Sequence, residues 1–157
     1  MKKFKLVLFG LLALFIITPN IVCAKNYWMK RSRVKSLVYS ATKYFHRYGK
    51  NQAFAAFSDR RGKFVRSSLY IFVFNYNGVC KASGDNPRSV GKNQFEHRDR
   101  HGNYPIQLLI RKAKKGGGWV TYFWRNPVTK RIEPKVSYVK PLSRRFLIGS
   151  GYYISPR

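Results

Sequence analysis

The spacing of apolar residues changes near residue 62, and that change limits the folds open to this chain. Before this point, apolar side chains recur at three- and four-residue steps, as on one face of a helix, at Val34, Leu37, Val38, Ala41, Tyr44, Phe45 and Tyr48. Lysines and arginines fall between them. The pattern predicts a long cationic helix over residues 25–57, with Gly49 as a kink or break.

After residue 62, short runs of β-branched and aromatic residues alternate with turn sequences, a pattern typical of strands. Leu69–Phe74 and Val79–Ala82 flank Asn75-Tyr76-Asn77-Gly78, which predicts a hairpin. Further strands are predicted over residues 119–124, 135–140 and 146–154. Because neighbouring strands have short connections, we expect an antiparallel sheet and an α+β fold.

One short helical insert interrupts the strands. Asn103–Lys115 carries Pro105 near its first turn, and Gly116-Gly117-Gly118 follows it as a break. These glycines precede neither a Lys-Ser/Thr pair nor a dinucleotide-binding pattern, so they predict a hinge rather than a phosphate loop.

Residues 1–24 have the organisation of a secretory signal peptide. Lys2, Lys3 and Lys5 precede an apolar run over residues 6–17, and Val22-Cys23-Ala24 offers small residues for cleavage after Ala24. The run holds twelve residues, whereas a bilayer span needs about twenty. We therefore expect a periplasmic or secreted protein; an uncleaved anchor is the alternative.

Charge is strongly one-sided. The chain has 32 Lys and Arg against 5 Asp and Glu, a formal charge of +27, and removal of the three leader lysines lowers it to +24. Such a field attracts anionic ligands and polyanions. The alternative reading is that the charge serves solubility alone.

Six short motifs follow one another in the second half of the chain. They are Tyr70-Ile71-Phe72-Val73-Phe74 with Asn77-Gly78; Asn86-Pro87 with Gly91-Lys92-Asn93; Asp99-Arg100-His101-Gly102; Gly118–Trp124 with Pro127; Lys135–Lys140; and Ile148-Gly149-Ser150-Gly151-Tyr152-Tyr153. In this order and spacing, over roughly residues 50–154, the set resembles the single-Cache family of extracellular sensor domains.

The resemblance implies a PAS-like antiparallel sheet with a long N-terminal helix and a short helical insert. It assigns residues 25–157 to one Cache domain, with the helix over about 25–57 and the sensor sheet over about 64–154. It also implies a pocket on one sheet face for a small organic anion, often a short-chain carboxylate. We expect no output module on this chain, so signalling would need a protein partner.

The predicted ligand-binding residues are Tyr70, Phe72, Tyr122, Trp124, Lys135 and Tyr138. Lys135 is the expected anion contact, because a lysine on a central strand is costly to bury without a partner. The alternative for Lys135 is a solvent-facing side chain, and for the aromatic residues it is plain core packing. Asp99 is expected to serve a turn or cap rather than a ligand.

Other chemistry has little support in the sequence. His97 and His101 have the four-residue spacing of a helical metal pair, but Arg98 and Arg100 would repel a cation and Gly102 indicates a loop. We expect no catalytic residue, no metal and no cofactor. Nucleic acid is not an expected partner. The alternative function is a cationic interaction protein on a Cache scaffold that binds polyanions, an anionic membrane or polysaccharide.

Overall fold

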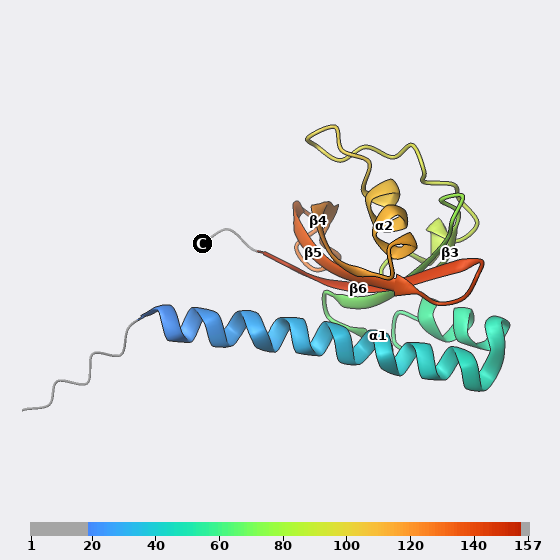
Figure 1. Cartoon of the computed structure of the whole chain (residues 1–157), viewed down its shortest axis with the longest axis horizontal. Helices are drawn as coiled ribbons and strands as arrows, with labels where there is room; N and C mark the ends of the chain where they lie inside the picture. Colours follow the sequence, from blue (N-terminus) through green and yellow to red (C-terminus); the bar gives the residue numbers. More distant parts are fainter. Residues whose placement is uncertain (1–18, 155–157) are drawn as a thin grey trace, which may run out of the picture.

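The computed structural model describes the backbone of residues 19–154 and the side chains of residues 27–154. A long helix lies across one face of an antiparallel sheet, and a short helix covers the other face (Figure 1). The elements, in chain order, are α1 (Pro19–Ser58), β1 (Val65–Arg66), β2 (Leu69–Asn75), β3 (Cys80–Ser83), η1 (Pro87–Ser89), α2 (Pro105–Lys114), β4 (Gly118–Arg125), β5 (Ile132–Pro141) and β6 (Phe146–Tyr153). The α+β prediction is confirmed.

The sheet has the order β1-β2-β6-β5-β4, with β3 added beside β2, and every pairing is antiparallel. The last strand, β6, lies in the middle of the sheet, between β2 and β5. Side chains along each strand alternate between the two faces. Neighbouring residues of β2 and of β6 therefore belong to two different cores.

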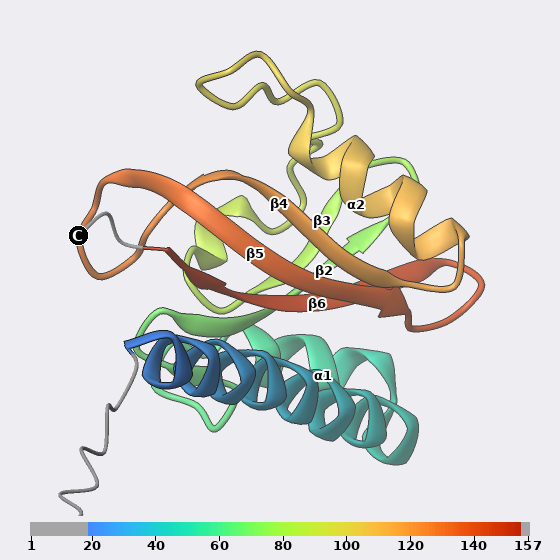
Figure 2. The ribbon, with the colours of Figure 1, turned by 60° about the vertical axis from the view of Figure 1, so that its left-hand side comes forward.

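Helix α1 contains the predicted break at Gly49, whose φ of 76° and ψ of 172° are not helical. A positive φ costs glycine little because it has no Cβ. The segment after Gly49 folds back toward the sheet (Figure 2). This return buries Ala53 and Phe57 against the same sheet face as Val38 and Ala41.

Helix α2 lies on the opposite face of the sheet from α1 (Figure 2). Its apolar residues recur at helical spacing, and Ile106, Leu109, Ile110 and Ala113 are all buried. Pro105 occupies the first turn, where a missing N–H breaks no helical hydrogen bond. The predicted insert is thus confirmed as a helix that packs one apolar side onto the sheet.

Two parts of the sheet differ from the sequence prediction. β5 begins at Ile132, earlier than predicted, and so includes Pro134. The Pro134 carbonyl accepts a hydrogen bond from the Ile154 N–H at 2.9 Å, which a proline can do although it has no N–H of its own to donate. β1 was not predicted, since two residues are too few to show a periodicity.

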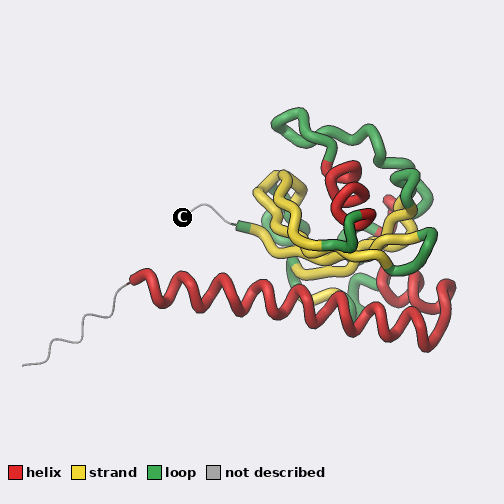
Figure 3. Tube along the Cα trace, viewed as in Figure 1, coloured by secondary structure: helices red, strands yellow, loops and turns green. Residues whose placement is uncertain are grey.

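The connection between β3 and α2 is mostly irregular, as the loop colour in Figure 3 shows. It passes over the α2 side of the sheet. The expected signal peptide falls largely on residues 1–18, outside the described part of the chain, and α1 begins at Pro19 within that segment. Within the described residues, no helix combines the length and apolar character needed to cross a bilayer.

Candidate ligand-binding site

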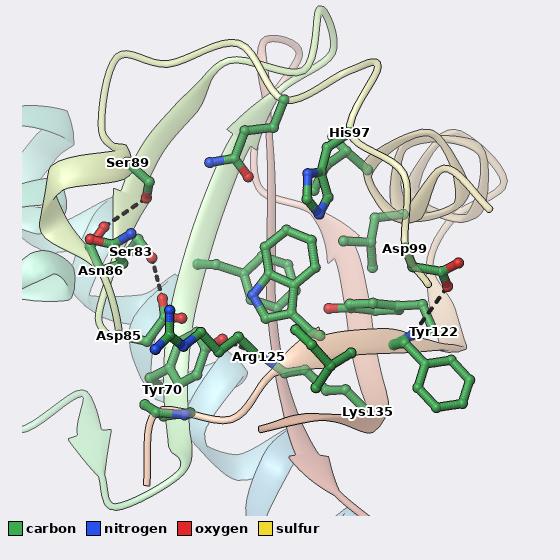
Figure 4. Close-up of a pocket in the computed structure, with 18 of the residues that line it drawn as sticks. Tyr70, Ser83, Asp85, Asn86, Ser89, His97, Asp99, Tyr122, Arg125 and Lys135 are labelled. Atoms are coloured by element: carbon green, nitrogen blue, oxygen red, sulfur yellow. Dashed lines mark hydrogen bonds between the residues drawn. The ribbon is translucent and has the colours of Figure 1, made fainter. Parts of the chain in front are cut away.

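A cavity of about 890 Å³ lies between the sheet, α2 and the β3–α2 connection. Its floor is formed by side chains of β2, β4 and β5, and Ile106 and Leu109 of α2 form one wall. Figure 4 places Tyr70, Asp85 and Arg125 at one end and His97 and Asp99 at the other. Volumes of this order are typical of small-molecule sites.

Lys135 lies on the floor of this cavity and is only 1% exposed. It is on β5, a central strand, where its Cα partners are Tyr122 and Tyr153. Its Nζ donates a hydrogen bond of 2.6 Å to the Tyr70 hydroxyl and lies 3.8 Å from the centroid of that ring. The rings of Phe72 and Tyr153 lie 5.4 Å and 5.1 Å from the same Nζ.

This environment changes the acidity of the ammonium group. Burial lowers the pKa of Lys135 from 10.5 to about 7, and the attraction of Asp85 raises it only in part. Near neutral pH the charged and neutral forms are therefore close in free energy. An anion that entered the cavity would favour the charged form.

A chain of hydroxyl groups continues from Lys135. The Tyr70 hydroxyl lies 3.3 Å from that of Tyr153, and the Tyr153 hydroxyl donates to the Arg125 carbonyl at 2.8 Å. Burial raises the pKa of Tyr70 and of Tyr153. These phenols therefore stay neutral, and because Tyr153 donates to Arg125, the Tyr70 hydroxyl is the donor in the bond between the two.

Aromatic rings form the wall beside Lys135. Tyr122 and Trp124 of β4 meet edge to face with centroids 5.9 Å apart, and His97 lies against Trp124 at 5.0 Å. The Tyr122 hydroxyl is bonded to Ser137 at 2.9 Å. Such a wall suits the apolar part of a small ligand, whose charged group would then meet Lys135.

Positive charge surrounds the mouth of the cavity. The lining includes six exposed basic residues, namely Arg60, Arg88, Arg98, Arg100, Arg125 and Lys130. Asp85 and Asp99 are the two carboxylates among the described residues that line it. The excess of cations draws anionic solutes toward the opening.

The carboxylates of Asp99 and Asp85 make different contacts. Asp99 accepts hydrogen bonds from the backbone N–H groups of His101, Asn103 and Phe123. Burial acts to raise its pKa, but these bonds lower it. Asp99 therefore ties the loop to strand β4, as the predicted turn role implies. Asp85 accepts from the Ser83 hydroxyl and shares the cavity with Lys135.

Five of the six predicted ligand-binding residues line the cavity: Tyr70, Phe72, Tyr122, Trp124 and Lys135. Tyr138 does not, and its placement in the site is corrected here. It follows Lys135 by three positions on β5, so its side chain points to the α1 face, where it packs against Trp119 and lies under Lys35. Asp85 and the basic residues of the mouth were missed, because only the fold brings them together.

The two histidines of the suggested metal pair lie in a loop rather than on a helix. His97 contacts Trp124, whereas His101 contacts the next residue, Phe123, at 4.4 Å. Within the described residues, no group of three or more metal-binding side chains occurs.

Fold and cavity together define a class, the PAS-like sensor domains with a long N-terminal helix. The model of the Single Cache domain 2 family matches residues 31–155, and this chain belongs to that family. The family comprises extracytoplasmic sensor domains like those of chemoreceptors and sensor histidine kinases.

One curated relative is the sensor histidine kinase MctS of Rhizobium johnstonii, 34% identical over 86 residues. The match covers 54% of this chain and 19% of the kinase, so the matched segment corresponds to about a fifth of that protein's length.

Solved structures share the fold at low identity. A methyl-accepting chemotaxis protein from Vibrio parahaemolyticus has a TM-score of 0.74 at 21% identity, over 87% of this chain and 97% of that one. A Cache chemosensory domain described for carboxylic acid recognition has a TM-score of 0.67 at 19% identity, over 88% and 99% of the two chains.

Proposed function

We propose that this protein is an extracytoplasmic sensor domain that binds a small organic anion, with the anionic group against Lys135. The observation that carries the proposal is the burial of this lysine beneath a cavity of ligand size. Among the described residues, its Nζ has one hydrogen-bond partner, the Tyr70 hydroxyl, while an ammonium group offers three donors.

A carboxylate is the favoured anionic group. Its oxygens would accept from Lys135 Nζ, and the aromatic wall of Tyr122 and Trp124 would cover a short apolar chain. The carboxylic acid recognition described for one structural neighbour supports this choice. Binding, rather than catalysis, is the proposed activity, and an unidentified protein partner would receive the signal.

A thermal-shift screen with small monocarboxylates, dicarboxylates and amino acids tests the proposal. A ligand at about a hundred times its dissociation constant should stabilise the protein by about 3 kcal/mol, a shift of several degrees. Lys135→Met should abolish the shift. Lys140→Met is the matched control, because Lys140 lies on the same strand but faces Tyr39, with its Nζ 5.2 Å from that ring centroid. A shift that survives in Lys135→Met would refute the assigned role.

We also propose that the chain is exported and cleaved after Ala24. The lysine-flanked apolar run at residues 6–17 supports this. The intact mass of the protein recovered outside the cytoplasm would decide it. A mass that includes residues 1–24 would instead identify an anchor.

A further inference from the structure

A second hollow lies on the other side of the sheet from the cavity described above. It is a groove of about 970 Å³ between α1 and the β1–β2 hairpin, and Tyr152 and Tyr153 of β6 lie at one end. None of the residues that define the proposed anion contact in the first cavity, Lys135 and Tyr70, lines this groove. The groove is therefore distinct from the proposed anion contact.

The charges of the groove have one sign. Two cations come from α1, Lys30 and Arg33, and two from the opposite bank, Lys63 and Arg66. Among the described residues that line the groove, none carries a carboxylate. Four like charges on facing banks repel one another, and an anion between the banks would remove that repulsion.

Hydroxyl groups accompany the cations. Ser32, Ser36 and Ser40 recur at four-residue steps on the side of α1 that lines the groove, and Ser68 faces them from the hairpin. Hydroxyl donors together with lysine and arginine form the usual surroundings of phosphate and sulfate oxygens.

An aromatic ring lies at one end of the groove. Tyr152 is only 8% exposed, and the Nζ of Lys30 lies 5.7 Å from its ring centroid. The Tyr152 hydroxyl lies beside Arg31 and Tyr27, which do not line the groove. Tyr152 therefore contributes its ring to this end of the groove.

The length of the groove indicates the shape of its ligand. Lys30 and Tyr44 both line it and are fourteen residues apart on α1, which corresponds to about 20 Å of helix. A single small anion cannot contact both ends. A flat bilayer surface cannot enter a groove to lie between its two banks. An extended chain with repeated anionic groups meets both conditions.

We propose that this groove is a second binding site, which takes an extended polymer carrying phosphate or sulfate groups along α1. The polymer lies between Lys30 and Arg33 on one bank and Lys63 and Arg66 on the other. This site is separate from the small-molecule cavity, so either can be present without the other.

The test measures binding of a fluorescent heparin fragment and of inorganic polyphosphate as salt increases. Arg33→Gln/Arg66→Gln should weaken binding of at least one of them about tenfold near 0.1 M salt and lower the salt slope by about two. Arg144→Gln/Arg145→Gln is the control with the same change of net charge, because both residues are exposed on the β5–β6 turn outside the groove. It should change affinity by less than about twofold.

Ser36→Ala provides a variant that keeps the charge. It should weaken polymer binding about threefold and leave the salt slope unchanged, because it removes one hydroxyl donor from the α1 bank, and alanine in a helix should leave the melting temperature the same or higher. A melting curve of each variant checks that it folds.

Three outcomes would overturn the proposal. The first is an equal loss of polymer affinity in the groove variant and in the control, which would mean that net charge alone attracts the polymer. Another is saturation of the groove by inorganic phosphate at low millimolar concentration, which would indicate a site for single ions. The third is binding to anionic phosphatidylglycerol vesicles that depends on Arg33 and Arg66 as strongly as polymer binding does.

Discussion

The two faces of the sheet are built from the same strands but differ in what they bury. On the α1 face, Ile71, Val73 and Ile148 pack against the helix and form an apolar core. On the α2 face, the alternate positions carry Tyr70, Lys135 and Ser137, all buried and all polar. Polar groups in a core cost free energy unless they are paired. The α1 face therefore stabilises the fold, whereas the α2 face carries buried polar groups beneath a cavity.

Replacing the buried lysine of the cavity face by an apolar side chain should produce the largest of the expected changes in stability. Lys135→Met should raise the free energy of unfolding at pH 7 by up to about 4 kcal/mol, because it removes a buried ammonium group.

The stability gained in Lys135→Met should depend on pH. The pKa of Lys135 is about 7 in the fold and 10.5 in the unfolded chain, so the unfolded chain binds the proton more tightly. The cost is full below about pH 7 and disappears as pH rises to about 10.5. Denaturant titrations at several pH values should show the gain of Lys135→Met shrinking across this window. A gain independent of pH would contradict the shifted pKa.

The next effect concerns the stabilising face. Ile148 is fully buried beneath α1, so Ile148→Ala should lower the free energy of unfolding by about 3 kcal/mol. Affinity for any ligand of the cavity should stay within about twofold once folding is accounted for. Scanning calorimetry measures the change in the free energy of unfolding. Titration calorimetry, at a temperature where the variant is folded, measures the affinity. A large loss of affinity would show that the two faces are coupled.

A smaller effect is expected at the loop that closes the cavity face. Asp99→Asn should lower stability by about 1–2 kcal/mol, because charged acceptors hold the three backbone N–H groups more strongly than an amide does. The loss should appear above about pH 4 and fade in acid, since the folded pKa of Asp99 lies below its ordinary value. Hydrogen exchange at Phe123, His101 and Asn103 would report it. Unchanged hydrogen exchange at these three N–H groups would show that Asp99 does not hold the loop on β4.

The smallest expected effect is that of removing one tyrosine hydroxyl from either face of the sheet. Tyr138→Phe removes a hydroxyl on the α1 face of β5 and should leave ligand affinity unchanged, whereas Tyr70→Phe, on the cavity face, should weaken it about tenfold. Calorimetric titration of both variants with the same ligand measures the difference. Equal losses in the two would contradict the assignment of faces.

Much of the fold was predictable because it depends on local patterns. The helical spacing of α1, the break at Gly49 and the hairpin turn at Gly78 all follow from neighbouring residues. The placement of β6 between β2 and β5 depends on pairings between distant parts of the chain, and no local pattern predicted it.

The candidate site was predictable in part. Lys135 and Tyr138 are three positions apart on one strand, so alternation alone puts them on opposite faces, and that rule was sufficient to exclude Tyr138. Asp85 and Arg60 reach the cavity from loops, and no local pattern could place them there. Loop residues join a site through tertiary structure.

Calorimetric titration against pH tests whether Lys135 meets the charged group of the ligand. With a carboxylate identified in the melting screen, affinity should stay constant from about pH 5, where the carboxylate is ionised, to about pH 7. It should fall by up to tenfold per unit above that, because the neutral amine must take up a proton on binding. Titrations in two buffers of different ionisation enthalpy should show that uptake, and Lys135→Met should lose both binding and uptake. Affinity that is independent of pH and retained in Lys135→Met would exclude Lys135 as the contact of the charged group.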